Sequence, residues 1–144
     1  MDLIRDELGA ELLNEPPTLH TLVEDVVLGA MGAQNAMRFF KRGVLLITPG
    51  DREDIVLAAC SGLEGHSQEK MAGIVLTGGL RPGDGVLKAI RAMPIPVLLT
   101  EEGSYQVASK VHDLNVKTRP DDAEKISLIR DIVAKNVNLK KILQ

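Results

Sequence analysis

The sequence predicts an α/β fold around a mostly parallel sheet, and two observations support this. Four short aliphatic runs are each bounded by glycine, proline or charged residues, which is typical of strands buried on both faces. Segments with helical spacing lie between these runs, and alternation of strand and helix implies parallel pairing. The runs are Val26–Leu28, Val44–Ile47, Gly73–Leu76 and Pro96–Leu99.

Capping and turn signals predict the other elements in chain order. Residues 3–8 predict a short helix and Glu11–Leu13 an edge strand, and a turn signal at residues 14–17 separates both from the rest of the chain. A last helix begins after Asp121 or Asp122, either of which can cap it. Helices are also expected over residues 33–41, 51–62, 84–93 and 104–114. We expect residues 1–144 to form a single domain, with residues 137–144 as a terminal tail.

The composition argues against several classes of protein. The 144 residues, 44% of them apolar and 26% charged, have the balance of one ordinary globular domain. The net charge is -3 and only three aromatic rings are present, so nucleic acid is not an expected partner. No apolar run approaches the roughly 18 residues of a membrane span, and the first residues lack a signal-peptide layout. A cytoplasmic protein without membrane contact is expected.

Signals for a metal, a cofactor or catalysis are weak. His20, His66 and His112 lie far apart, so no metal site is expected. The glycine-rich residues 78–83 lack the lysine of a phosphate-binding loop, and no serine stands in a Gly-x-Ser-x-Gly elbow. Cys60 falls in an apolar helical run and is expected to be a small buried residue. We therefore expect no cofactor and no nucleophile with its base.

Three of the predicted strands end in the same residue type, at Thr48, Thr77 and Thr100. In a parallel sheet these endings share one edge, and open α/β folds hold ligands in a crevice at that edge. Any chemistry of the protein is expected there.

Four charged residues, 51–54, stand at the start of the helix that comes after the second strand. Asp51 stands where an N-cap belongs, with Asp54 reinforcing the positive end of the helix dipole. Arg52 opposes that dipole, so capping does not explain it. Arg52 therefore either binds a ligand or partner, or forms a surface ion pair. The candidate partners for such a pair are Glu53, Asp84 and Glu101.

A second glycine-rich turn comes after the third strand, at residues 77–84. Consecutive Gly78 and Gly79 allow positive φ and close backbone approach, which a bound ligand and a tight turn both require. Arg81 is a second cation near this edge and Thr77 supplies a hydroxyl. Together with Arg52, these residues could form a small anion site.

The order of these motifs resembles the DRTGG domain family. An Asp-Arg pair after one buried strand precedes Thr-Gly-Gly after the next, and the resemblance extends through residues 27–31 and 121–126 to nearly the full chain. The residues that match the motif are Asp51, Arg52, Thr77, Gly78 and Gly79. The resemblance does not say what these residues do.

The resemblance implies a three-layer α/β/α sandwich similar to the N-terminal domain of HPr kinase/phosphorylase. Domains of this family stand beside catalytic domains in long bacterial phosphotransacetylases and among the CBS modules of regulated pyrophosphatases, which implies a regulatory or assembly role. In this sequence Glu53 directly follows Arg52 and adds negative charge beside the proposed anion site. That charge favours a singly charged ligand over a highly charged phosphate.

These observations support three functions. The first is a non-catalytic regulatory domain that binds a small anionic metabolite or nucleotide at the carboxyl ends of the strands. The second is a homodimerisation module, or a docking module for a partner metabolic enzyme, to which the aliphatic residues of the tail contribute. An enzyme has the least support, since only Asp51, Arg52 and Asp54 supply acid and base groups. The ligand-binding candidates are Asp51, Arg52, Thr77, Gly78, Gly79 and Arg81.

Overall fold

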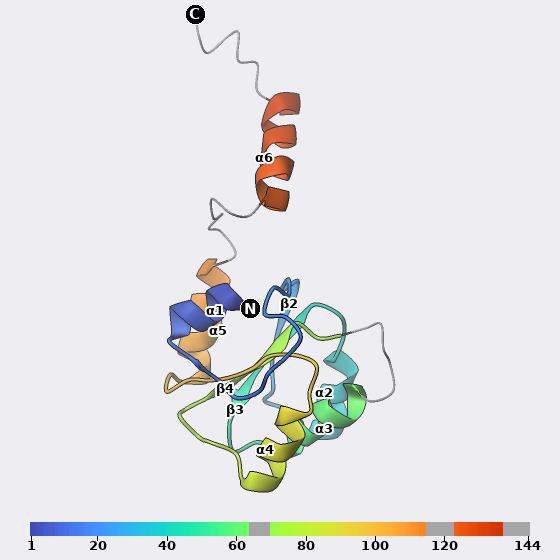
Figure 1. Ribbon diagram of the computed structural model, residues 1–144, viewed down its shortest axis with the longest axis vertical. Helices are drawn as coiled ribbons and strands as arrows, with labels where there is room; N and C mark the ends of the chain where they lie inside the picture. Colours follow the sequence, from blue (N-terminus) through green and yellow to red (C-terminus); the bar gives the residue numbers. More distant parts are fainter. Residues whose placement is uncertain (64–69, 115–122, 137–144) are drawn as a thin grey trace, which may run out of the picture. The chain divides into compact units, whose positions relative to one another are not determined.

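The computed structural model describes residues 1–63, 70–114 and 123–136 (Figure 1). Its five-stranded sheet has the order β1-β5-β4-β3-β2. Strands β2 to β5 are parallel and β1 pairs antiparallel with β5, which confirms the mostly parallel sheet and the edge strand. The strands are β1 (Glu11–Leu12), β2 (Asp25–Leu28), β3 (Val44–Pro49), β4 (Gly73–Thr77) and β5 (Val97–Leu99).

The helices lie close to the predicted ranges, and some of their ends differ. The helix expected over residues 84–93 ends at Arg91. The helix expected over residues 33–41 is shorter, because a 3₁₀ turn, η1, tightens its end before the chain enters β3. The helix expected from Asp51 begins at Glu53. None of the described helices has both the length and the apolar character needed to span a bilayer. The bounds are α1 (Asp2–Leu8), α2 (Ala33–Ala36), η1 (Met37–Phe39), α3 (Glu53–Leu63), α4 (Asp84–Arg91), α5 (Ser104–Leu114) and α6 (Ala123–Asn136).

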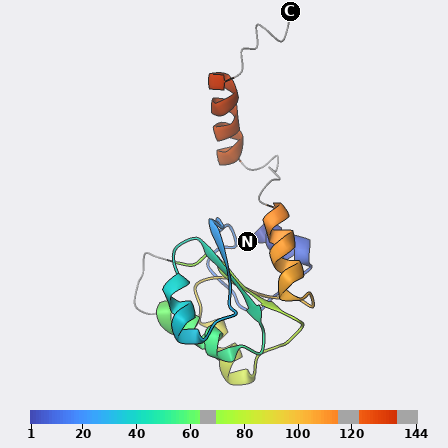
Figure 2. The same cartoon turned by 180° about the vertical axis from the view of Figure 1, so that it is seen from behind.

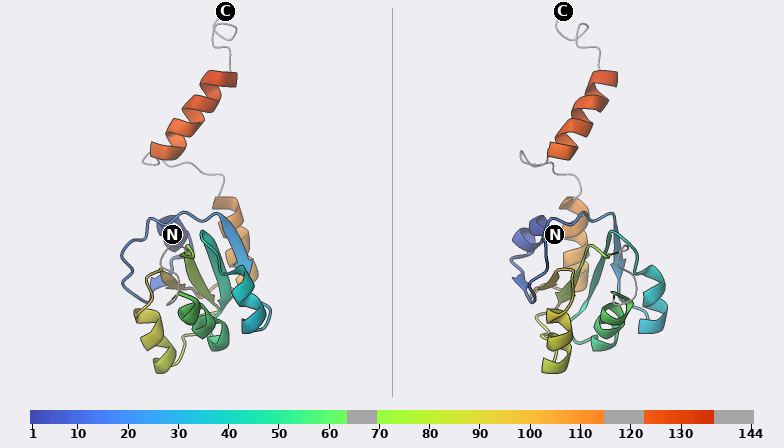
Figure 3. Two further views of the ribbon diagram at one scale, coloured as in Figure 1. Left: turned by 90° about the vertical axis from the view of Figure 1, so that its right-hand side faces the viewer. Right: turned by 45° about the vertical axis from the view of Figure 1, so that its right-hand side comes forward.

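The sheet is covered on both faces, which gives the three-layer α/β/α sandwich (Figures 1, 2 and 3). Along β3, Leu46 packs with the core of α3 and α4, whereas Leu45 and Ile47 pack with α1 and α5. This alternation is the period-two pattern of a strand, here with apolar side chains on both sides. Cys60, on α3, is half-buried and packs against the α3 and α4 core.

Chain order decides which helices share a face. From β2 to β5 each crossover steps to the next strand in the same direction, so α3 and α4 lie on one face. The chain leaves β5 toward the opposite face, where α5 packs beside α1. The loops after β3 and β5 therefore diverge at the edge where the parallel strands end, which we call the carboxyl edge.

The structure consists of two compact units, residues 1–114 and 115–144, and α6 is described by itself. The final helix is present as predicted. The capping residues Asp121 and Asp122, His66 and the tail at residues 137–144 lie outside the described residues. The single-domain organisation over residues 1–144 stays a prediction.

A buried asparagine holds the segment between α4 and β5. The Asn14 side-chain amide donates to the carbonyls of Met93 and Ile95, at 3.1 and 2.7 Å, and its oxygen accepts from the Val97 N–H at 3.0 Å. Three backbone groups that would otherwise be buried without partners are thus satisfied by one side chain. Asn14 in effect continues the pairing of β1 with β5.

We expect Asn14→Ala to lower the free energy of unfolding by ~3 kcal/mol, because each buried backbone group left without a partner costs about 1–3 kcal/mol. Urea unfolding measures this. The matched control is Asn35→Ala on the exposed surface of α2, which should stay within about 0.5 kcal/mol of the unmodified protein. Equal effects of the two substitutions would contradict a structural role for Asn14.

Candidate functional site

The three threonines at the strand ends lie together at the carboxyl edge, and all are buried. Their hydroxyls are engaged within the fold. Thr48 Oγ1 donates to the Gly29 carbonyl at 3.3 Å, Thr77 Oγ1 lies 2.7 Å from Ser104 Oγ, and Thr100 Oγ1 accepts a backbone N–H at 3.3 Å. The repeated threonine therefore terminates the strands and ties them to the loops around them.

A pocket of about 260 Å³ lies at the carboxyl edge. It is formed by the end of β2 and the loop after it, by β3 and the loop that enters α3, and by the first residue of α5. The diverging loops after β3 and β5 create this hollow. Its lining residues are Leu28, Gly29, Ala30, Ile47, Pro49, Asp51, Arg52 and Ser104.

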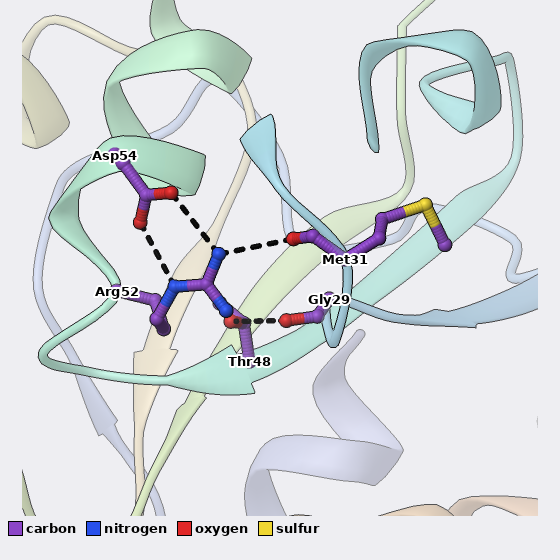
Figure 4. Close-up of polar contacts among 5 residues, drawn as sticks. All are labelled: Gly29, Met31, Thr48, Arg52 and Asp54. Atoms are coloured by element: carbon purple, nitrogen blue, oxygen red, sulfur yellow. Dashed lines mark hydrogen bonds and ion pairs between the residues drawn. The ribbon is translucent and has the colours of Figure 1, made fainter. Parts of the chain in front are cut away.

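Arg52 is held at the wall of this pocket by a forked set of hydrogen bonds (Figure 4). Its Nε and Nη2 donate to the two carboxylate oxygens of Asp54, at 2.9 and 3.0 Å, and Nη2 also donates to the Met31 carbonyl at 3.0 Å. The third nitrogen, Nη1, hydrogen-bonds none of the other described residues. The Arg52 side chain is 32% exposed, and Arg52 is one of the residues that line the pocket.

The ion pair shifts both partners away from their ordinary titration ranges. The hydrogen bond from Arg52 lowers the pKa of Asp54, and the same bond raises the pKa of Arg52. A lowered carboxyl pKa stabilises the fold above the usual range of aspartate, and this contribution is lost as pH falls through the folded-state value. The pair is therefore formed at neutral pH, although its exposure keeps its contribution to stability small.

Two predictions about this helix start are wrong. Arg52, not Asp51, occupies the N-cap position, because its carbonyl accepts the N–H groups of Ile55 and Val56. The Asp51 carboxylate lines the pocket and hydrogen-bonds no other described residue. The ion-pair partner of Arg52 is Asp54, which is none of the three expected acids.

The Thr-Gly-Gly turn is not open to a ligand through its glycine amides. Gly78 and Gly79 donate their N–H groups to the carbonyls of Glu102 and Thr100, both at 2.8 Å. Both glycines have positive φ, 78° and 64°, and a Cβ on Gly79 would meet the carboxylate of Glu101. These glycines therefore make a tight turn that joins the loops after β4 and β5.

Arg81 does not join Arg52 in an anion site. Its guanidinium pairs with Glu11 on the edge strand β1, and Arg81 is not among the residues that line the pocket. Of the predicted site residues, the structure brings Asp51 and Arg52 to the pocket and places Thr77 one hydrogen bond away through Ser104.

Sequence reasoning missed Ser104 and the wall formed by Leu28, Gly29 and Ala30. Ser104 could have been found from the sequence, since it begins the helix that comes after the third of the strands that end in threonine. The wall belongs to the segment already recognised as similar to the family. Within the described residues, no group of three or more His, Cys, Asp or Glu side chains could hold a metal ion.

The fold and this pocket define an α/β/α sandwich domain with a small hollow at the carboxyl edge of its sheet. The sequence model of the DRTGG domain matches residues 3–114, and the chain belongs to the DRTGG domain family. This confirms the resemblance found in the motifs.

Curated relatives are phosphate acetyltransferases. The chain is 30% identical to the enzyme of Nitratidesulfovibrio vulgaris over 99% of its own length and 21% of the relative's, and 31% identical to that of Pseudomonas aeruginosa over 98% and 20%. The chain thus spans about a fifth of the length of these relatives.

A solved structure shares the fold. It is the CBS and DRTGG region of the regulatory part of Clostridium perfringens pyrophosphatase, complexed with the activator diadenosine tetraphosphate. The similarity has a TM-score of 0.62 at 19% identity and covers 96% of this chain and 60% of that one.

We expect Gly79→Ala to lower the free energy of unfolding by about 1–2 kcal/mol, because alanine is strained in the left-handed backbone conformation of this residue (φ 64°). Denaturant unfolding tests this. The matched control is Gly85→Ala near the start of α4, where a Cβ meets nothing within 4 Å and alanine favours the helix. It should raise stability by up to about 1 kcal/mol. A Gly79→Ala protein as stable as the control would contradict the tight-turn role.

Proposed function

We propose that this chain is a cytoplasmic, non-catalytic regulatory domain that binds a small anionic metabolite or nucleotide at the carboxyl edge of its sheet. One observation carries the proposal. Arg52 stands at the pocket wall with two of its nitrogens fixed by Asp54 and Met31, while Nη1 hydrogen-bonds no other described residue.

The fork favours binding because it holds the arginine in place before the ligand arrives. A guanidinium already oriented loses little rotamer freedom when it donates to an anion, and such charge-assisted bonds are about twice as strong as neutral ones. Ser104, on the α5 side of the pocket, supplies a hydroxyl to the same hollow. Asp51 and Arg52 would thus be site residues, whereas Gly78 and Gly79 would shape the edge.

The family supports a regulatory role. The pyrophosphatase region with this fold is a regulatory region complexed with a nucleotide activator. The phosphate acetyltransferase relatives are about five times longer than this chain. Most of their length lies outside the matching segment, where their catalytic residues could be located. By analogy, this domain would work beside or within a metabolic enzyme and report on a ligand.

We expect a specific ligand to raise the melting temperature of the purified protein. A ligand present at 100 times its dissociation constant raises the free energy of unfolding by about 2.7 kcal/mol. For a protein of this size, that corresponds to a rise in melting temperature on the order of ten degrees. The panel contains adenine nucleotides, diadenosine tetraphosphate, acetyl phosphate, acyl-CoA and simple carboxylates. The shift should disappear in Arg52→Ala and persist in Arg38→Ala, a control at an exposed arginine of η1.

If a ligand still raises the melting temperature of the Arg52→Ala protein, this site is contradicted. If no ligand of the panel raises the melting temperature of the unmodified protein, the ligand-sensing role is contradicted. Because Arg52 also ties the loop after β2 to α3, circular dichroism of each variant must show an unchanged fold.

A docking or homodimerisation module is a second candidate, and α6 is the observation that favours it. Leu128 is 60% exposed, Ile129 45% and Ile132 51% on this helix. Apolar side chains exposed together mark a surface for another helix or protein. A second copy of the chain is the simplest partner, since symmetric dimers are the commonest soluble oligomers.

If α6 mediates self-association, Leu128→Lys combined with Ile129→Lys should convert a dimer to a monomer in sedimentation. The added charges would have to be buried in the interface without partners. Ser127→Lys is the control, an exposed position on the same helix. A mass that is unchanged by the double substitution would contradict this role for α6.

A further inference from the structure

The charges around Arg52 decide what kind of anion the pocket can take. Residues 51–54 hold three carboxylates and one guanidinium, and that guanidinium is already paired with Asp54 at 2.9 Å. Asp51 lines the pocket itself. Glu53, the residue after Arg52 in the chain, accepts a hydrogen bond from the Gly83 N–H at 2.7 Å. Each additional negative charge on a ligand increases the repulsion from these carboxylates. A ligand with one negative charge is therefore disfavoured least, and Nη1 of Arg52 can donate a hydrogen bond to it.

The size and walls of the pocket favour a short aliphatic group. Its volume of about 260 Å³ lies below the range of roughly 300–1,000 Å³ that is common for ligand pockets. Leu28, Ile47 and Pro49 supply apolar walls. Leu28 leaves 46% of its surface exposed, and a ligand chain lying against it would remove apolar surface from water.

A second donor faces the same hollow. Ser104 lines the pocket and its Oγ lies 2.7 Å from Thr77 Oγ1, where either oxygen can be the donor. When the buried Thr77 donates, the Ser104 hydroxyl is left to donate its own hydrogen to a ligand oxygen. Thr77, the threonine of the Thr-Gly-Gly motif, then acts as a positioning residue for Ser104.

We infer that the ligand of this pocket is a monoanionic carboxylate with a short unbranched aliphatic chain. Its carboxylate accepts from Arg52 Nη1 and Ser104 Oγ, and its chain lies against Leu28, Ile47 and Pro49. This inference rests on the proposed ligand-sensing function and names the ligand class for that same site.

The test measures dissociation constants from amide chemical shifts in the full chain. The probes are the straight-chain carboxylates from acetate to hexanoate, the primary alcohols of equal length, inorganic phosphate and AMP. Affinity should rise about fourfold per added methylene, which corresponds to ~0.8 kcal/mol, until the pocket is full. Alcohols should bind at least about tenfold more weakly than carboxylates, because they lack the charge-assisted bonds.

Variants separate the two donors. Ser104→Ala should weaken carboxylate binding about tenfold or more, while Ser109→Ala, at an exposed serine of the same helix, should not. Thr77→Val should weaken binding and Thr77→Ser should restore it, since only the second keeps the hydroxyl. If Thr77→Ser, which removes a methyl group but keeps the hydroxyl, restores carboxylate binding, the loss in Thr77→Val is due to the missing hydroxyl and not to a change in packing at this buried position.

The outcomes are distinct. If phosphate or AMP binds more tightly than any carboxylate and Arg52→Ala abolishes that binding, the carboxylate inference is overturned and the proposed function stands. An affinity independent of chain length also overturns the inference. If no anion moves the resonances of the pocket residues, both the inference and the proposed function fail.

Discussion

Strands β3 and β4 are buried on both faces, and this constraint organises the rest of the structure. A sheet with apolar side chains above and below must be covered twice, once by α3 and α4 and once by α1 and α5. The chain meets this requirement by stepping in one direction from β2 to β5 and only then crossing to the other face. Burial of the leucine and isoleucine side chains of these strands is the favourable free-energy contribution that holds the described helices against the sheet.

The same topology creates the pocket. Loops that leave β3 and β5 toward opposite faces cannot pack fully on one another, so a hollow stays between them. The turns at this edge are held by hydrogen bonds of the buried threonines and of Gly78 and Gly79, which have positive φ. The hydrogen bonds of Arg52 to Met31 and Asp54 then tie the loop after β2 to the start of α3, and the same side chain lines the hollow.

The motif residues of the family divide into two physical roles. Gly78 and Gly79 use their amides inside the fold. Arg81, a predicted site residue outside the motif, is paired with the edge strand. Asp51, Arg52 and, through Ser104, Thr77 are the positions that reach the pocket. The residues from which the linear sequence predicts one small anion site are therefore mostly turn chemistry, with a compact set of polar groups beside it.

The strands, most helix bounds and the α/β class are determined by the sequence alone, because periodicity, capping and glycine turns are local properties. The site is not. Arg52 pairs with Asp54 at the start of α3, which begins one residue later than an Asp51 cap would place it, and Arg52 also reaches the Met31 carbonyl, 21 residues away in the chain. Ser104 joins the pocket because α5 crosses to the opposite face of the sheet. Those placements depend on how distant segments pack, which no local pattern encodes, so only the tertiary structure decided which candidate residues meet.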